Sequence, residues 1–166
     1  MSARALLDRH WDAALPVRPV ALASSAGLLV FRRADFSAVA GIERDVNGRP
    51  VIMLGPAPGS AQEKLRERFA IAHSLGHVVL SHFGPDDLPH QDVASHFSLS
   101  ATSPIERAAN DFAMALLVPE DALEVVLRDR RSISEIASIF VVSEVALQQR
   151  LIDLGMLPRK GAPLRM

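Results

Sequence analysis

The stretch ERFAIAHSLGHVVL, residues 67–80, decides how the rest of this chain is organised. Its residues are mostly apolar and predict a helix, and it carries His73 and His77 four positions apart. Each helical residue turns by about 100°, so positions four apart differ by only about 40°. Both imidazoles therefore leave the same face of the predicted helix, one turn apart. This is the spacing with which a helix offers two nitrogen ligands to one zinc ion.

Ser74 follows the first histidine, at the position that decides whether such a site can be catalytic. In the zinc-peptidase pattern H-E-x-x-H, the Glu takes a proton from zinc-bound water. A serine hydroxyl is far too weak a base to replace that carboxylate, although it could hydrogen-bond the water. A lone H-x-x-x-H also arises often by chance, as two hydrogen-bonded histidines on a buried helix. The residues alone leave both interpretations of His73 and His77 open.

Composition limits the kind of protein. The 166 residues suit one domain of ordinary size, and 18 basic against 19 acidic residues lack the basic excess of most nucleic-acid binders. Because there is no cysteine, any metal must be bound by His and carboxylate groups. No stretch reaches the roughly 18 apolar residues of a membrane span, and the charged N-terminus does not resemble a signal peptide. We expect a soluble cytoplasmic protein with no membrane partner.

The segments that precede this helix predict an α+β fold. Two short helices are expected first, over 3–14 and 19–26, with Gly27 as a left-handed stop. Three strand candidates follow, at 28–33, 37–44 and 50–54. Asn47-Gly48, between the last two, is a strong hairpin signal. A small, mostly antiparallel sheet therefore comes before the central helix, which we expect to run from about Ala61 to Ser81.

Glu106 opens the next predicted helix and is the candidate third metal ligand. Ser103 suits the N-cap and Pro104 the first helical position, so Ser103-x-x-Glu106 has the form of a capping box. On the residues alone, this capping role is the better-supported interpretation of Glu106. Asn110 lies one turn further on the same face, between apolar neighbours. It is either an ordinary surface residue or a side chain whose oxygen accepts the second ring N–H of a ligating His.

Residues 82–102 have loop composition and contain further groups that could approach a metal: His82, His90, His96, Asp86 and Asp87. His82 lies about 140° round the helix from His77, so it shares that face only if the helix has already ended. The roles of these loop groups stay open.

Residues 132–155 predict two short helices around a tight turn, similar to a helix-turn-helix. The second would expose side chains that could contact base edges, namely Ser143, Glu144, Gln148, Gln149 and Arg150. Only one of these is basic and Glu144 would face phosphates unfavourably, so we favour a helical hairpin that packs on the core or mediates self-association. We divide the chain into a domain over 1–130 and a C-terminal hairpin with a basic tail over 131–166, which we expect to pack on that domain.

Two segments together resemble the ImmA/IrrE family of metallopeptidases. RERFAIAHSLGHVVLSH (66–82) is similar to its signature R-x-R-F-T-x-A-H-E-L-G-H-x-x-L-H, and ERAANDFAMALLVPEDAL (106–123) to its E-x-x-A-N-x-F-A-x-x-L-L-M-P element. The resemblance implies a zincin-like fold with a metal-site helix pair. It also implies one zinc ion bound by His73, His77 and Glu106, with Asn110 behind a ligating His. Ser74 stands where this family has its catalytic Glu.

The resemblance further implies that the protein controls a helix-turn-helix (Xre-type) repressor or antitoxin. Because Ser74 replaces the base, we interpret the chain as a zinc-binding pseudo-peptidase that retains a peptide-binding edge strand near 37–44. One alternative is an active metallopeptidase with a displaced base, such as a loop His or Asp or a group supplied by the partner. Because the chain has no Tyr, His82, His90, His96 or an Arg would have to stabilise the oxyanion. Another is a DNA-binding or toxin-like module that acts through 132–155, although the sequence disfavours direct DNA contact. Enzymatic activity and oligomeric state stay undecided at this stage.

Overall fold

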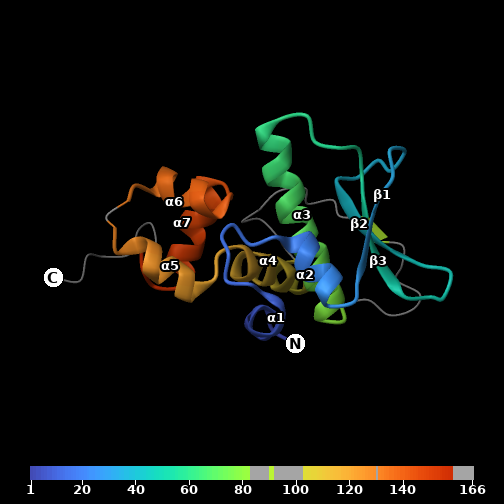
Figure 1. The fold of residues 1–166 in the computed structure, drawn as a ribbon, viewed down its shortest axis with the longest axis horizontal. Helices are drawn as coiled ribbons and strands as arrows, with labels where there is room; N and C mark the ends of the chain where they lie inside the picture. Colours follow the sequence, from blue (N-terminus) through green and yellow to red (C-terminus); the bar gives the residue numbers. More distant parts are fainter. Residues whose placement is uncertain (83–89, 92–102, 130, 159–166) are drawn as a thin grey trace.

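A computed structural model describes residues 1–82, 90–91, 103–129 and 131–158, and its elements follow the expected α+β order (Figure 1). The helices are α1 (Ala3–His10), α2 (Pro19–Ser25), α3 (Ala61–Val79), α4 (Pro104–Leu117), α5 (Glu120–Leu127), α6 (Ile133–Phe140) and α7 (Glu144–Asp153). The strands are β1 (Leu29–Arg32), β2 (Ala40–Arg44), β3 (Pro50–Leu54) and β4 (His90–Gln91). The predicted fold class is confirmed. Over the described ranges, every helix falls short of the length and apolar character that crossing a bilayer requires.

The first helix is shorter than its apolar pattern predicts, since it ends at His10. Trp11 is extended, and the Asp12 side chain accepts a hydrogen bond from the backbone N–H of Ala14 (3.1 Å). The indole N–H of Trp11 donates to the Ala14 carbonyl (3.0 Å). Hydrogen bonds between a side chain and the nearby backbone compete with the hydrogen bonds of a helix. Here the bonds of Trp11 and Asp12 replace a further helical turn.

The sheet has the order β1-β3-β2-β4, with antiparallel β2–β3 and β2–β4 pairs and a parallel β1–β3 pair. The predicted hairpin is confirmed, and Gly48 takes the positive φ of 76° that its turn requires. Strand β4 arises inside the stretch expected to be loop. It pairs with Gly41 and Ile42 of β2, so the expectation of a free edge strand is wrong over these two residues.

Helix α3 is the centre of the fold and packs against α4, α2 and the inner strands (Figure 1). In the view of Figure 1 it stands between the sheet on one side and α5–α7 on the other. Its start is fixed by a capping box. The Ser60 hydroxyl accepts a hydrogen bond from the backbone N–H of Glu63, and the Glu63 carboxylate accepts one from the backbone N–H of Ser60. Phe69, Ala72 and Leu75 of α3 are buried in the main apolar cluster. The helix carrying both histidines is therefore anchored on several sides.

Gly76 sets how closely α4 approaches α3. A Cβ atom built on Gly76 would lie 3.1 Å from the ring of Phe112 on α4. That distance is tighter than nine in ten real Cβ contacts, so with a larger residue here the Phe112 side chain would have to shift by a few tenths of an ångström. The glycine between the two histidines in sequence thus brings the first turn of α4 within reach of the imidazoles.

The C-terminal segment forms the expected pair of short helices around a tight turn, α6 and α7. Val141 takes a left-handed conformation (φ 53°) between them, while Phe140, Leu147 and Leu151 are buried in the main cluster. Arg68 of α3 ties this segment to the core. Its guanidinium donates to the carbonyls of Val17 (2.8 Å), Val141 (3.2 Å) and Phe140 (3.3 Å).

Candidate metal site

His73, His77 and Glu106 converge at the contact between α3 and the first turn of α4. His73 Nε2 lies 3.1 Å from one carboxylate oxygen of Glu106, and His77 Nε2 lies 3.3 Å from the other. The two Nε2 atoms are 2.9 Å apart. Both histidines are completely buried, whereas the Glu106 side chain is 30% exposed. The fold therefore aims two nitrogens and one carboxylate at a common point.

This geometry fits a metal ion. Ligand bonds of about 2.0–2.1 Å in tetrahedral zinc sites place neighbouring ligand atoms about 3.3 Å apart. The three separations here, 2.9, 3.1 and 3.3 Å, are close to that value. Two His and one Glu are also the protein ligands of one class of catalytic zinc site, which keeps its fourth position for water or substrate. These three residues could bind a metal ion.

The capping role that the residues alone favoured for Glu106 is wrong. Ser103 is the N-cap and Pro104 begins the helix, as expected, but the Ser103 side chain makes no capping hydrogen bond. One short carboxylate cannot reach back to the N-cap N–H and across to α3 at once. It reaches across, where two buried imidazoles offer stronger polar partners than the solvent-accessible helix end.

Two further residues singled out from the sequence are buried beside this cluster. Ser74, next to His73 on α3, has no exposed surface. Asn110, one turn after Glu106 on α4, is 5% exposed. Its burial on the inward face excludes the ordinary surface role, and its contact with a ligating His stays a prediction.

The end of α3 brings His82 to the other side of His77. Ser81 is left-handed (φ 56°), and the N–H of His82 donates to the His77 carbonyl (3.0 Å). The chain therefore turns back, and His82 Nδ1 lies 3.0 Å from His77 Nδ1. The helix has ended before His82, which is the condition under which His82 could share the face of His77. Its ring nevertheless contacts the ring of His77 and not the point where the three candidate ligand atoms converge. Burial lowers the pKa of His82, a shift that the negative charge of Glu106 opposes.

The remaining loop groups fall outside the described side chains. Asp86, Asp87 and His96 lie in residues that the structure does not describe, and only the backbone of His90 is described, in β4. Sequence reasoning on these groups therefore stays a prediction.

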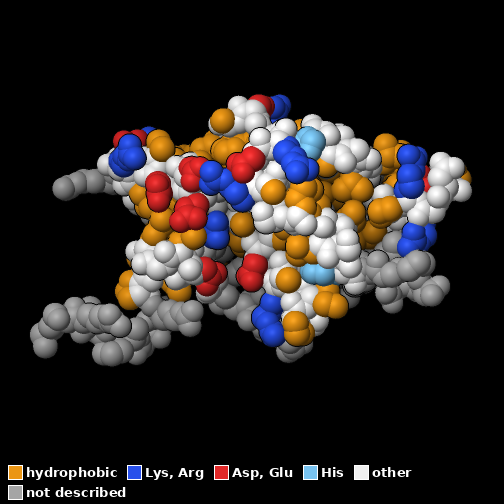
Figure 2. Space-filling view, turned by 90° about the horizontal axis from the view of Figure 1, so that it is seen from below, with side chains coloured by type: hydrophobic (Ala, Val, Ile, Leu, Met, Phe, Trp, Pro, Cys, Tyr) orange, Lys and Arg blue, Asp and Glu red, His pale blue; other side chains and the backbone are white. Residues whose placement is uncertain are grey.

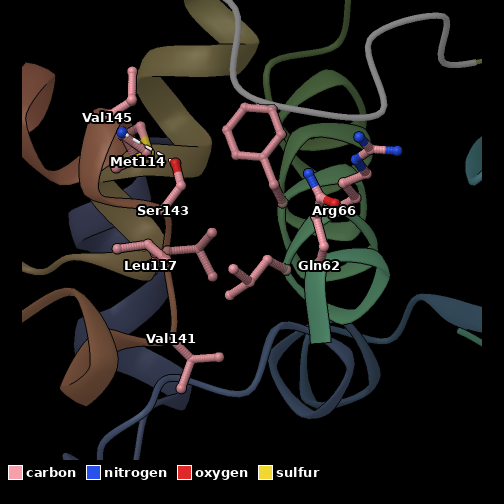
Figure 3. A pocket seen from close by; sticks show the side chains of 11 residues that line it. Gln62, Arg66, Met114, Leu117, Val141, Ser143 and Val145 are labelled. Carbon is pink, nitrogen blue, oxygen red and sulfur yellow. Dashed lines mark hydrogen bonds between the residues drawn. The ribbon is translucent and has the colours of Figure 1, made fainter. Parts of the chain in front are cut away.

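A separate hollow of about 350 Å³ lies between the first half of α3, the end of α4 and the start of α7 (Figure 3). Gln62 and Arg66 line it from α3, Leu117 from α4, and Val141 and Val145 from the C-terminal segment. No sequence motif indicated this space, because it forms only when the hairpin packs beside α3. None of its lining residues is one of the three candidate metal ligands.

The helix pair, the small sheet and the three converging side chains define a metallopeptidase-like α+β protein. The family model of the IrrE N-terminal-like domain, in the M78 peptidase family, matches residues 23–152. The chain belongs to this family, which confirms the resemblance drawn from the two sequence segments. A comparison with curated proteins found no match.

Proposed function

We propose that this protein binds one zinc ion through His73, His77 and Glu106 and acts as a pseudo-peptidase. In this role it controls a helix-turn-helix repressor or antitoxin by binding it without cutting it. The ligand atoms support the first part, since they lie 2.9–3.3 Å apart on buried or partly buried side chains. Membership of the M78 family supports a role in which a protein segment is the partner.

Ser74 is the observation that carries the pseudo-peptidase proposal. Bound zinc would polarise a carbonyl and lower the pKa of a bound water, but hydrolysis by this route also needs a base to take the proton of that water. Ser74 occupies the position of that base and has only a hydroxyl. Within the described ranges, Glu106 is the only carboxylate in the candidate metal cluster. His82 lies against the Nδ1 side of His77, away from the three converging atoms.

Zinc content of the purified protein tests the metal site directly. We expect one zinc per chain in the wild type, and less than a tenth of that in His73→Ala. His10→Ala is the matched control, because His10 lies on α1 and is only half-buried. Wild-type protein that remains metal-free in zinc-containing medium would contradict the proposal.

Cleavage of the partner tests the missing base. The assay needs a helix-turn-helix repressor or antitoxin as candidate substrate, to be sought among the proteins encoded beside this one. We expect the wild type to bind that protein without cutting it, and Ser74→Glu, which restores H-E-x-x-H, to cut it in a chelator-sensitive way. The double variant Ser74→Glu/His73→Ala should be inactive. A chelator-sensitive cut by the wild type would instead favour the alternative, an active peptidase with a displaced base.

Direct DNA contact through the C-terminal hairpin is the alternative that the structure's charges favour least. Arg150, its one basic candidate, is half-buried and donates to the Val118 carbonyl (3.3 Å). Figure 2 shows the molecule from below, and on that face acidic and basic side chains lie side by side without forming a basic stripe. Nucleic-acid binding should weaken steeply as salt rises. We expect no retention on its own promoter DNA at low salt, and retention would favour the DNA-binding function.

A further inference from the structure

The last turn of α3 holds two histidines ring to ring. The rings of His77 and His82 are 5.0 Å apart between centroids and inclined by 78°, with their Nδ1 atoms 3.0 Å apart. His77 is fully buried and His82 half-buried. The proposed zinc site uses the opposite edge of His77, its Nε2 atom.

We propose that His82 is a positioning residue, which holds His77 ready for metal by accepting the hydrogen bond of its Nδ1–H. The inference rests on the proposed zinc binding and assigns a role to a residue that is not itself a ligand. Ligating histidines are usually held by a carboxylate, a carbonyl or water at their second nitrogen. In this chain an imidazole occupies that place.

The 3.0 Å contact and the metal together determine which nitrogen carries each proton. A histidine that ligates through Nε2 uses the lone pair of that atom, so its one ring proton lies on Nδ1. Only one of two nitrogens in contact can carry the proton between them. His77 is therefore the donor, and His82 is the acceptor with its own proton on Nε2. This tautomer pair also fixes the plane of the His77 ring.

The backbone makes this contact a built feature of the fold. The N–H of His82 donates to the His77 carbonyl (3.0 Å), and the N–H of Ser81 donates to the Val78 carbonyl (3.2 Å). With the left-handed Ser81, these two bonds form a Schellman motif, which brings the residue after the turn over the last helical turn. The two imidazoles are thus held together by their own main chain.

The geometry argues against His82 as an additional ligand. Its Nδ1 faces the Nδ1 edge of His77, whereas the converging atoms lie at the Nε2 edge. The cluster of possible metal ligands among the described side chains is His73, His77 and Glu106. An acceptor role uses the position that His82 has in the fold, and a ligand role would require it to leave that position.

Three substitutions separate an acceptor role from a merely structural one. His82→Ala removes the acceptor. His82→Asn keeps one, because Oδ1 of Asn stands where Nδ1 of His stands, whereas His82→Gln places its oxygen one bond further out. Zinc affinity is measured by competition with a chromophoric chelator. We expect affinity to fall about 10–100-fold in the Ala and Gln variants, as when outer partners of ligating histidines are lost, and to stay near wild type in the Asn variant.

Two controls accompany these measurements. Thermal unfolding of the zinc-free variants separates a fold defect from a binding defect, and His10→Ala controls for loss of a histidine elsewhere. The visible spectrum of cobalt(II)-loaded protein is a second readout, and it should change in Ala and Gln but not in Asn.

The outcomes distinguish this inference from the function on which it rests. Equal zinc affinity in wild type and His82→Ala would overturn the positioning role and leave the zinc site intact. Equal losses in the Asn, Gln and Ala variants would also overturn it, because the acceptor would then be irrelevant. If the wild type itself binds no zinc, the proposed function fails and the inference fails with it.

Discussion

Arg68→Met should weaken the attachment of the C-terminal hairpin to the core and lower the free energy of unfolding by about 3 kcal/mol. The guanidinium donates to three carbonyls, those of Val17 (2.8 Å), Val141 (3.2 Å) and Phe140 (3.3 Å). Hydrogen bonds from a charged donor contribute about 1.5–3 kcal/mol each, and we take about 1 kcal/mol each because two are long and Arg68 is only half-buried. Methionine keeps the packing of the aliphatic stem, so the loss isolates the polar contacts. Arg68→Lys, with one compact ammonium group, should recover only part of it.

Urea unfolding followed by circular dichroism and by the fluorescence of Trp11 measures this effect. Arg66→Met is the matched control, because Arg66 lies on the same helix with an exposed side chain, and surface changes usually stay within about 0.5 kcal/mol. A midpoint for Arg68→Met that coincides with that of Arg66→Met would refute the reasoning. It would mean that water satisfies the three carbonyls as well as the guanidinium does.

Three other changes test separate parts of the structure. Val141→Gly should raise stability by about 1 kcal/mol, because a β-branched residue at φ 53° is strained, and a lower melting temperature would contradict this. The pKa of Glu63 is lowered by hydrogen bonds from the backbone of Gly59 and then Ser60. Its stabilisation is therefore present above the ordinary value of 4.5 and lost as pH falls through the lower folded pKa. Glu63→Gln should reduce the loss of folding stability as pH falls below 4.5, measured by urea unfolding at several pH values. An unchanged loss would show that Glu63 is not its source. Zinc at a hundredfold excess over its Kd should stabilise the wild type by about 2.7 kcal/mol; scanning calorimetry of Glu106→Gln should show less than half of that shift.

Local patterns predicted most of the elements correctly, and the two misses have different causes. Asn47-Gly48 predicted its hairpin, and Gly27 its helix stop, because each conformation depends on neighbouring residues alone. The first helix was predicted too long, since apolar spacing does not register that the side chains of Trp11 and Asp12 bond the local backbone. Strand β4 was missed because two residues have no periodicity, and their pairing with β2 depends on a distant segment.

Glu106 shows how far the site could be predicted. From the residues alone it read as a helix cap, and only the family resemblance indicated a ligand role. The structure shows why spacing misleads here. The capping pattern exists in sequence, but the carboxylate turns to the two imidazoles of α3, which lie thirty-three and twenty-nine positions earlier in the chain. A local motif cannot reveal a partner that the packing of two helices supplies.

The sequence by itself determined the chemistry that is available: two histidines on one helical face, no cysteine, and a serine where a base would stand. It also determined the fold class, because hydrophobic periodicity and turn residues act over a few positions. Only the tertiary structure decided which groups meet. The close approach of α4 at Gly76 brings Glu106 to the histidines, and the reversal at Ser81 turns His82 onto His77. Such contacts depend on the packing of whole elements and on a backbone conformation unusual for serine, and neither is visible in the order of residues.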